Sequence, residues 1–511
     1  MICNNGLSSS ATNFLLCFVL YVFALHTPPV LAAEDSYSSS LPIPATEKFY
    51  IYEWWGLCRK MNCREKSNFG AGRTVNSTNG IYDTYQYDLF NLMYSRFFLD
   101  PRRTTNPDEA TTFILSYDPH FDSMTFRKPN GKQDRSFFEG SSDYAPEVVK
   151  LLEASPHFQK KKGKDHLLIV GWPYAISQLI LKPKAVPLFI LCDQCTKLTI
   201  ENYSFLYSSD PKNDRTIAQQ YKGDNWFAVP YPSNFHWSAN IKPPLLYEEQ
   251  DRPYLVSYIG SSTCFSEFST AIRHDLVKYC TVHAPDCQHA HYSKHGPRNS
   301  DLAEGLRDPH YQYTLRSTFC LQPLGDTTTR KGLFDAIMFG CIPVVFHPLS
   351  ASAMYTWHWS TQLWKDVIIE IPINMSPAPN EPALLSDPIL YLKQLYEKDV
   401  EDIRRRQRLM RRHAFELSYA LEFYKEGSSW PLDEQGKPVR DAYEITMDHV
   451  LGLHAGRATQ SIPGDLLGEK RQVWKAEIDR LLPAYYNEEF MTALKKYEQK
   501  KGKKIAGEGQ N

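Results

Sequence analysis

One stretch of thirty residues, from Phe319 to Pro348, limits more than any other what this chain can fold into. It reads FCLQPLGDTTTRKGLFDAIMFGCIPVVFHP, and its pattern predicts a strand, a turn, a helix, a turn and a second strand. Strands joined through a helix run parallel, so the stretch predicts an α/β fold with a parallel sheet. The helix is predicted to begin near Thr328 or Thr329, which places Arg330 in its first turn.

The charges at the start of this helix predict an anion site. A helix N-terminus carries partial positive charge, so Arg330 and Lys331 are unfavourable there unless an anion binds. Gly325 allows close approach of the backbone to a ligand, and the threonines at 327–329 supply hydroxyl and N–H groups. A diphosphate would satisfy these N–H groups and neutralise Arg330. Asp335, one turn later, could accept hydrogen bonds from a ribose, or could instead form a salt bridge with Lys331.

Elsewhere, predicted strands alternate with predicted helices in two successive sets, separated by a Pro-rich, charged linker at 241–253. The predicted strands are 48–55, 108–118, 165–172, 184–193 and 225–232 in the first set, and 254–260 and 366–372 beside the opening stretch in the second. The predicted helices are 82–98, 141–156, 269–280 and 392–421. Two such sets indicate two Rossmann-like domains, whose ligands bind at the carboxyl ends of the strands.

The N-terminus predicts entry into the secretory pathway. Residues 1–33 contain no Asp, Glu, Lys or Arg, and 14–25 are continuously apolar, which suits a cleaved signal peptide or a signal anchor in the membrane. Either one places the chain from Glu34 onward in the lumen. Sequons at Asn76 and Asn202 agree with that location and are candidate glycosylation sites.

The cysteines are consistent with an oxidising compartment. Nine of the eleven lie beyond the leader, so some are expected to pair. The local candidates are Cys58 with Cys63 and Cys280 with Cys287. Cys192 and Cys195 are interpreted as structural thiols or a disulfide. The segment 280–295 is rich in Cys and His, but its spacing fits no zinc motif, so zinc is the weaker alternative there.

Several ordered motifs resemble one family across most of the chain. They are FCLQP at Phe319–Pro323, GD with TR at Gly325–Asp326 and Thr329–Arg330, FD with GCIPV at Phe334–Asp335 and Gly340–Val344, YTWH at Tyr355–His358, PYPSNFH at Pro230–His236 and DAYE at Asp441–Glu444. Together they resemble the exostosin-type glycosyltransferases of family GT47, most of all the plant xyloglucan galactosyltransferase branch.

The resemblance implies a GT-B fold, in which two Rossmann-like domains face each other across a cleft, and a lumenal Golgi enzyme with a single-pass membrane anchor. It implies an inverting transferase with a UDP-sugar donor and no metal or other cofactor. The chain has no Asp-x-Asp motif, which agrees with the absence of a metal. The implied organisation is a signal peptide or anchor at 1–33, a stem at 34–46, an acceptor domain at 47–240, a donor domain at 254–425, a helical extension at 426–497 and a disordered tail at 498–511.

The resemblance and the strand ends together give the candidate site residues. The donor-binding candidates are Gly260, Ser261, Arg273, Ser317, Gly325, Asp326, Thr329, Arg330 and Asp335. Inversion in a single displacement needs a general base on the acceptor hydroxyl. Asp118, His120 and Asp122 follow the strand ending TTFILSY, and Asp122 matches the family position, so it is the first choice. His166 is a further candidate, with holding a loop as its alternative role.

Two departures from the family leave the exact substrates open. Residues 261–264 and 172–174 stand where the related enzymes carry basic residues. Transfer of galactose from UDP-galactose to xyloglucan-like side chains is the favoured interpretation, and arabinosyl, xylosyl or uronosyl transfer are alternatives. A non-catalytic lumenal partner that binds UDP-sugar or glycan is the other alternative. A complex with other Golgi transferases is possible, whereas a net charge of −1 gives no indication of nucleic-acid binding.

Overall fold

The computed structural model describes residues 47–457, which belong to one compact unit. Its gaps are 55–56, 58–66, 77–79, 128–132, 136–141, 174–182, 203–224, 239–251, 265, 291–308, 376, 378–380, 429 and 434. The predicted leader, stem, tail and Cys58–Cys63 pair and most of the predicted linker lie outside the described residues. Within the described residues, no helix is both long enough and apolar enough to cross a membrane.

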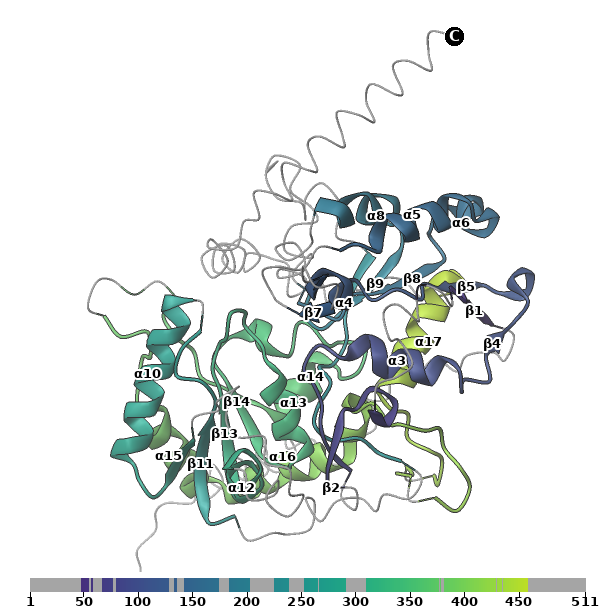
Figure 1. Ribbon diagram of the computed structural model, residues 1–511. Coiled ribbons are helices and arrows are strands. Elements are labelled where there is room, and N and C mark those ends of the chain that lie inside the picture. Colours follow the sequence, from purple (N-terminus) through teal and green to yellow (C-terminus); the bar gives the residue numbers. More distant parts are fainter. Residues whose placement is uncertain are drawn as a thin grey trace, which may run out of the picture. The chain divides into compact units, whose positions relative to one another are not determined.

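The first half of the chain forms a parallel sheet of six strands (Figure 1). Their order across the sheet is β10-β9-β8-β5-β1-β4. Their bounds are β1 Phe49–Ile51, β4 Arg103–Thr104, β5 Thr112–Ile114, β8 His166–Ile169, β9 Thr196–Thr199 and β10 Trp226–Ala228. The strands are short, and their central members β5, β8 and β9 are buried at every residue, as parallel strands covered on both faces must be.

The second half forms a parallel sheet of five strands in the order β12-β11-β13-β14-β15. Their bounds are β11 Tyr254–Ile259, β12 Cys287–Ala290, β13 Ser317–Gln322, β14 Ile342–Val345 and β15 Ile369–Glu370. Counted along the chain, this order is 2-1-3-4-5, a doubly wound arrangement whose direction reverses between β11 and β13. Two parallel sheets confirm the predicted α/β class with two Rossmann-like halves, the architecture of a GT-B fold.

Helices connect the strands and cover the sheets. In the first half they are α3 Leu89–Phe97, α4 Pro119–Met124, α5 Ala145–Glu153, α6 Pro156–Lys161 and α8 Val186–Leu191. In the second half they are α10 Glu267–Val282, α12 Pro309–Arg316, α13 Lys331–Met338, α14 Thr361–Val367, α15 Pro388–Lys398 and α16 Val400–His413, followed by α17 Ala442–His454. Antiparallel pairs β2 Arg73–Asn76 with β3 Ile81–Asp83, and β6 Thr125–Arg127 with β7 Gln133–Arg135, stand apart from the main sheets.

Three predictions about elements were wrong. The segment 184–193 is a short helix, α8, and the strand beside it is β9, because the apolar run VPLFIL fits a buried helix as well as a strand. The long helix predicted at 392–421 breaks at Asp399, whose carboxylate accepts a hydrogen bond from Asp402 N and caps α16. Helix α13 begins at Lys331, so Arg330 is its N-cap residue rather than a residue of its first turn.

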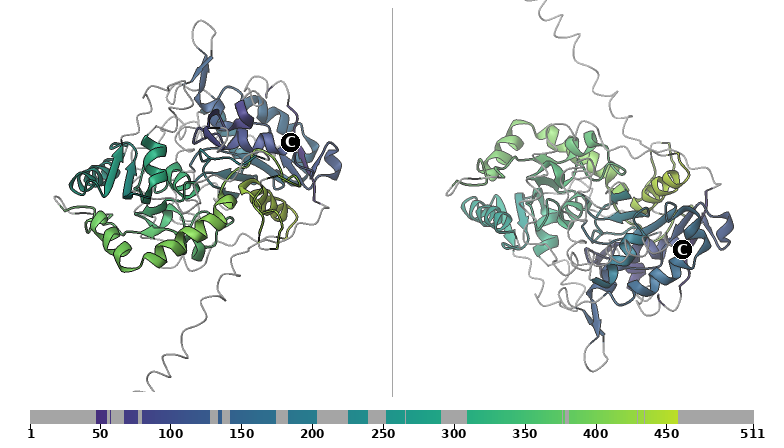
Figure 2. Two further views of the ribbon diagram at one scale, coloured as in Figure 1. Left: turned by 90° about the horizontal axis from the view of Figure 1, so that it is seen from below. Right: turned by 90° about the horizontal axis from the view of Figure 1, so that it is seen from above.

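The last described helix, α17, belongs to the second half of the sequence but packs against the first sheet. His454 accepts or donates hydrogen bonds with the hydroxyls of Thr112 and Thr196, at the starts of β5 and β9. Arg457 pairs with Glu47, just before β1. In both views of Figure 2 this yellow helix lies beside the blue strands of the first half. The C-terminal part of the chain therefore helps to hold the N-terminal sheet.

Two disulfides lie in the second half. Cys280 pairs with Cys287, which confirms the local pairing and removes both thiols from the alternative zinc site. Cys320 pairs with Cys341 and links β13 to the residue before β14, a pairing that the sequence did not predict. Cys192 and Cys195 are free, buried thiols. Within the part of the chain that the structure describes, no three His, Cys, Asp or Glu side chains gather as a metal site.

Candidate functional site

The point where the C-terminal sheet reverses direction brings together two of the predicted donor-binding residues. Gly260 directly follows β11, and Arg330 lies in the loop between β13 and α13. A Cβ atom at position 260 would lie 2.8 Å from Arg330 Nη2, so a larger residue would displace the guanidinium. Glycine at position 260 therefore lets the Arg330 side chain pass directly over the backbone. Ligands of doubly wound sheets bind at such a reversal point.

Arg273, on α10, ties the two loops of this site together. Its Nε donates to the Leu324 carbonyl at 2.9 Å, and its Nη1 donates to the Ser261 carbonyl at 3.0 Å. Leu324 follows β13 and Ser261 follows β11, so one buried side chain fixes the loops on both sides of the reversal point. Gly325 leaves room for it, since a Cβ there would lie 3.2 Å from Arg273 Nη2.

The two guanidinium groups give the site a strong positive charge. Carbonyl groups accept the hydrogen bonds that Arg273 makes with described residues, so its charge is not neutralised by them. Within the described residues, Arg330 Nη1 is buried and has no hydrogen-bond partner. Burial and the neighbouring charge of Arg273 lower the pKa of Arg330. Two close cations and an unsatisfied buried donor are the features of a site built for an anion with several oxygens.

Asp335 lies one turn into α13, as predicted, but its carboxylate is held by protein groups. Lys331 Nζ donates to Asp335 Oδ1 at 3.0 Å and to Oδ2 at 2.8 Å. The backbone N of Asn234, in the first half of the chain, donates to Oδ1 at 2.8 Å. The structure thus contains the salt bridge that was the alternative interpretation. The ribose-binding role of Asp335 stays a prediction.

The remaining donor-binding candidates divide by position. Asp326 and Thr329 lie in the same loop as Arg330, Asp326 half-buried and Thr329 buried. Ser317 is the first residue of β13, and its carbonyl accepts a hydrogen bond from Arg252. Because β13 runs from Ser317 to Gln322 and the loop begins beyond it, Ser317 lies at the opposite end of the strand from the arginines. This position does not favour contact with a donor near the arginines, and the donor-binding role of Ser317 stays a prediction.

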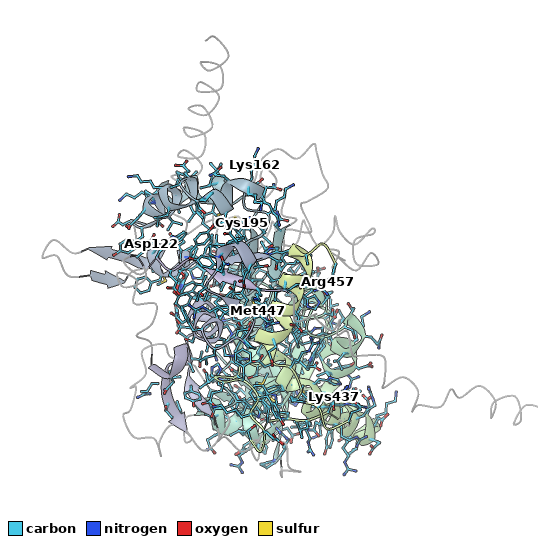
Figure 3. All side chains as sticks on the ribbon, turned by 90° about the vertical axis from the view of Figure 1, so that its right-hand side faces the viewer. Asp122, Lys162, Cys195, Lys437, Met447 and Arg457 are labelled. Carbon is cyan, nitrogen blue, oxygen red and sulfur yellow. A yellow bond between two sulfur atoms is a disulfide. The ribbon has the colours of Figure 1, made fainter. Side chains whose placement is uncertain are left out.

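Asp122, the first choice for the general base, is a buried helix cap. It lies in α4 at the foot of the β6–β7 hairpin, where Figure 3 labels it. Its Oδ2 accepts hydrogen bonds from the Tyr117 hydroxyl at 2.7 Å and from the backbone N of Tyr144 and Ala145, both at 3.0 Å. The two backbone hydrogen bonds hold the N-terminus of α5 against the Asp122 carboxylate. Burial raises the pKa of Asp122 to about 6, against the effect of these hydrogen bonds.

We expect a pH dependence if Asp122 is the general base. Only its carboxylate form can accept a proton, so the transfer rate should rise with pH through a midpoint of about 6. The stability effect has the opposite sign, because a raised folded-state pKa favours the protonated form and its stabilisation is lost as pH rises through about 6. The measurement is kcat/KM and the free energy of unfolding across this range.

Asp122→Asn provides the control, because an amide oxygen still accepts the capping hydrogen bonds but cannot act as a base. A folded Asp122→Asn variant should lose about 100-fold or more of its transfer rate together with the midpoint near pH 6. Retained transfer with a wild-type pH profile would restrict Asp122 to its capping role and move the base to another residue of the same sheet edge.

The other base candidates lie in different settings. Asp118 follows β5 and caps α4 by accepting a hydrogen bond from Phe121 N. His166 is the first residue of β8 and pairs through its ring nitrogens with Asp165 and the Tyr52 hydroxyl. Burial lowers the pKa of His166. Its fully buried ring links the start of β8 to Tyr52, the residue after β1, which fits the alternative structural role. His166 does not lie at the carboxyl end of its strand, where the ligands of such sheets bind.

A cluster of aromatic rings follows the carboxyl ends of β5 and β8, and the sequence did not reveal it. The His120 ring lies 4.5 Å from that of Trp172, 5.3 Å from that of Tyr87 and 5.9 Å from that of Tyr85, measured between centroids. Tyr85 is 43% exposed, so the cluster reaches the surface. Burial raises the pKa of Tyr87 well above its usual value, with smaller contributions from the charges of Asp326 and Glu201, so Tyr87 lies near the donor loop. Aromatic faces next to a polar site suit the packing of sugar rings.

Glu201 is a second residue that sequence reasoning missed. It follows β9, is fully buried, and accepts hydrogen bonds at Oε1 from the hydroxyls of Tyr231 and Thr327. Thr327 belongs to the loop that carries Arg330. The only available signal was its position after a strand, and that strand was not recognised.

The two sequon asparagines differ in what the structure shows of them. Asn76 ends β2, and the residues that complete its sequon lie outside the described part of the chain. Asn202 is half-buried, and its Nδ2 donates to the Trp226 carbonyl at 2.6 Å. N-glycosylation would attach the glycan to this same nitrogen, so the contact does not favour modification of Asn202. Glycosylation at both positions stays a prediction.

Comparison with known proteins identifies the family of this chain. The exostosin GT47 domain matches residues 34–376, a stretch that includes both parallel sheets and the loops around Arg273 and Arg330. The chain belongs to the exostosin GT47 family. The predicted resemblance to this family is thus confirmed.

Similar members of the exostosin GT47 family come from Arabidopsis thaliana. A probable xyloglucan galactosyltransferase is 26% identical over 68% of this chain and 74% of its own length. Xyloglucan-specific galacturonosyltransferase 1 is 28% identical over 58% of this chain and 41% of its own length. Xyloglucan galactosyltransferase MUR3 is 28% identical over 59% of this chain and 47% of its own length. The chain therefore spans less than half the length of the last two relatives.

Two solved structures match this GT47 chain at low TM-scores. A GtfA/B complex matches with 12% identity over 65% of this chain and 63% of that one, at a TM-score of 0.29. MnaA of S. aureus in complex with UDP matches with 11% identity over 81% of this chain and 98% of the MnaA chain, at a TM-score of 0.28. Neither TM-score is high enough to support a structural inference.

Proposed function

We propose that this chain is an inverting glycosyltransferase that moves a sugar from a UDP-sugar to a xyloglucan-type glycan. The observation that carries the proposal is the pair Arg273 and Arg330 at the reversal point of the C-terminal sheet, with Arg330 Nη1 buried and unsatisfied within the described residues. A diphosphate supplies the oxygens and the negative charge that this site lacks. Membership of the GT47 family supports a nucleotide sugar as the source of that diphosphate.

The mechanism follows from where negative charge develops. In a single displacement, the acceptor hydroxyl attacks the anomeric carbon, a base takes its proton, and the bond to the diphosphate breaks. Negative charge therefore grows on the leaving UDP, where Arg330 is placed to stabilise it. Asp335 is proposed to bind the ribose, which would require it to share its carboxylate with Lys331. The base is proposed to come from Asp122 or its neighbours Asp118 and His120 at the N-terminal sheet edge.

Galactose is the proposed sugar, because relatives named as xyloglucan galactosyltransferases are similar over more than half of this chain. A specific observation favours galacturonic acid as a second candidate for the sugar. A relative named as a xyloglucan galacturonosyltransferase is equally similar, at 28% identity. A non-catalytic glycan-binding partner is the remaining alternative.

We further propose a Golgi-lumenal enzyme that needs no metal ion and is held by its N-terminal segment in the membrane. The charge-free run at 1–33 supports the location, and the two arginines support a diphosphate site that does not depend on a metal. Association with other Golgi transferases would be consistent with this location.

A donor panel tests these assignments together. Purified full-length chain is incubated with xyloglucan and UDP-galactose, UDP-galacturonic acid, UDP-arabinose or UDP-xylose, with and without EDTA. Transfer from UDP-galactose that persists in EDTA is expected. Transfer abolished by EDTA and restored by a divalent ion would contradict the metal-free mechanism. Xyloglucan binding without turnover of any donor would favour the non-catalytic alternative.

A further inference from the structure

Two consecutive residues of the N-terminal half, Ile200 and Glu201, accept hydrogen bonds from side chains of the C-terminal half. Glu201 Oε1 accepts a hydrogen bond from the Thr327 hydroxyl at 2.9 Å and another from the Tyr231 hydroxyl. The carbonyl of Ile200, one residue earlier, accepts a hydrogen bond from the Tyr355 hydroxyl at 2.7 Å. Thr327 and Tyr355 both belong to the second half of the chain. The end of strand β9 is thus linked to the donor half through two hydroxyl groups.

Thr327 is well placed to control the geometry of the donor loop. Its carbonyl accepts a hydrogen bond from Gly325 N at 2.8 Å, which closes a tight turn at the start of the loop. It lies three residues before Arg330, whose guanidinium passes over Gly260. Because the turn is closed on Thr327 itself, a shift of Thr327 would move both Gly325 and Arg330.

The chemistry of Glu201 suits this task. Its side chain is fully buried, and a buried carboxylate is costly unless hydrogen bonds compensate for the lost water. Burial, with a contribution from the charge of Glu201, raises the pKa of Tyr231 and of Tyr355 well above its usual value. Both hydroxyls therefore keep their protons over the ordinary pH range, so Tyr231 remains a donor to Glu201 and Tyr355 remains a donor to the Ile200 carbonyl. Hydrogen bonds to an ionised acceptor are about twice as strong as neutral ones.

We propose that Glu201 is a positioning residue for donor binding, which fixes Thr327 and with it the loop from Gly325 to Arg330 in the geometry that meets the diphosphate of the UDP-sugar. The inference rests on the proposed function. Glu201 acts through the loop, so its loss changes donor affinity more than the rate of the chemical step. A purely structural role would instead lower stability and leave the affinity of the folded enzyme unchanged.

Thr327→Val tests the proposal, because it removes the hydroxyl and nearly preserves the side-chain volume. We expect a rise of about tenfold in the dissociation constant for UDP, measured by calorimetry, and in KM for the donor, with kcat within about threefold of wild type. Thr327→Ser retains the hydroxyl and should restore wild-type affinity. Glu201→Gln keeps the shape but loses the charge, and should weaken UDP binding in the same direction.

Thr446→Val is the matched control. Like Thr327, Thr446 is a buried threonine whose hydroxyl donates a hydrogen bond to a protein oxygen, here the carbonyl of Ala442. It lies in α17, outside the donor loop. It should lower the melting temperature without changing UDP affinity. Tyr355→Phe removes the hydrogen bond to the Ile200 carbonyl and serves as a second test variant if Thr327→Val does not fold. We expect Tyr355→Phe to weaken UDP binding about threefold or more.

The outcomes separate this inference from the proposed function. A folded wild-type chain that binds no UDP would overturn both. A wild-type chain that binds UDP, alongside folded Thr327→Val and Tyr355→Phe variants of unchanged UDP affinity, would overturn only the positioning role of Glu201.

Discussion

Arg330→Ala is expected to reduce sugar transfer by about 100-fold or more, the usual loss when a group that stabilises developing negative charge is removed. UDP affinity should fall about 10-fold to 100-fold, because a charge-assisted hydrogen bond in a buried site is lost. The reason is structural: Arg330 is held over Gly260 with a buried nitrogen that no described protein group satisfies. Calorimetry with UDP and initial-rate kinetics measure the two effects.

Two further variants sharpen the result for Arg330. Arg330→Lys keeps the charge but loses the planar fork, so it should recover part of the affinity and less of the rate. Arg404→Ala is the control, since Arg404 is 67% exposed and pairs only weakly with Glu401 at 3.9 Å. It should behave as wild type. An Arg330→Ala variant with wild-type UDP affinity would remove Arg330 from the donor site.

Arg96→Met is expected to have the largest effect on stability, about 3–5 kcal/mol in the free energy of unfolding. Arg96, on α3, donates from Nη1 to Asp441 Oδ2 and to the Ala420 carbonyl, each at 2.6 Å, and its guanidinium lies over the Phe423 ring. The side chains of Arg96 and Asp441 are 2% and 0% exposed. Methionine fills a similar volume but leaves the Asp441 charge buried without its cation. Urea unfolding followed by fluorescence measures the loss.

The control for this prediction is an exposed ion pair. Lys48 and Glu109 also approach within 2.7 Å, but their side chains are 44% and 47% exposed. Lys48→Ala should therefore cost less than about 1 kcal/mol. The double variant Arg96→Met with Asp441→Asn should lose less than the sum of the single variants, since it removes the uncompensated charge. A loss for Arg96→Met as small as that for Lys48→Ala would contradict a structural role for the pair.

The sequence predicted most of the framework because a parallel strand that is buried on both faces leaves a local signal, a continuous apolar run. Strands β5, β8, β13 and β14 are buried on both faces and read as apolar runs, which the pattern detects directly. Strand β9 escaped because it contains Lys197, whose buried ammonium is satisfied by the carbonyls of Asp193 and Cys195. Such compensation by carbonyl groups is a tertiary effect that residue type alone does not reveal.

The candidate site was predicted in part, and the division has a physical cause. Arg330, Gly325 and Gly260 stand next to predicted strand ends, so local spacing and family motifs were sufficient to find them. Glu201 could not be found in this way, because its partner Thr327 is 126 residues away. Ser317 lies at the other end of β13 from the arginines, and a motif alone does not state which end of a strand faces the ligand.

The most direct test of the account is transfer of labelled galactose from UDP-galactose to xyloglucan oligosaccharides, with wild type and Arg330→Ala measured side by side. We expect a galactosylated product with inverted anomeric configuration from the wild type, and at least about 100-fold less from Arg330→Ala. Product formed at equal rates by both proteins would contradict the assignment of the arginine site to the leaving diphosphate. Absence of product with every UDP-sugar would contradict the proposed activity itself.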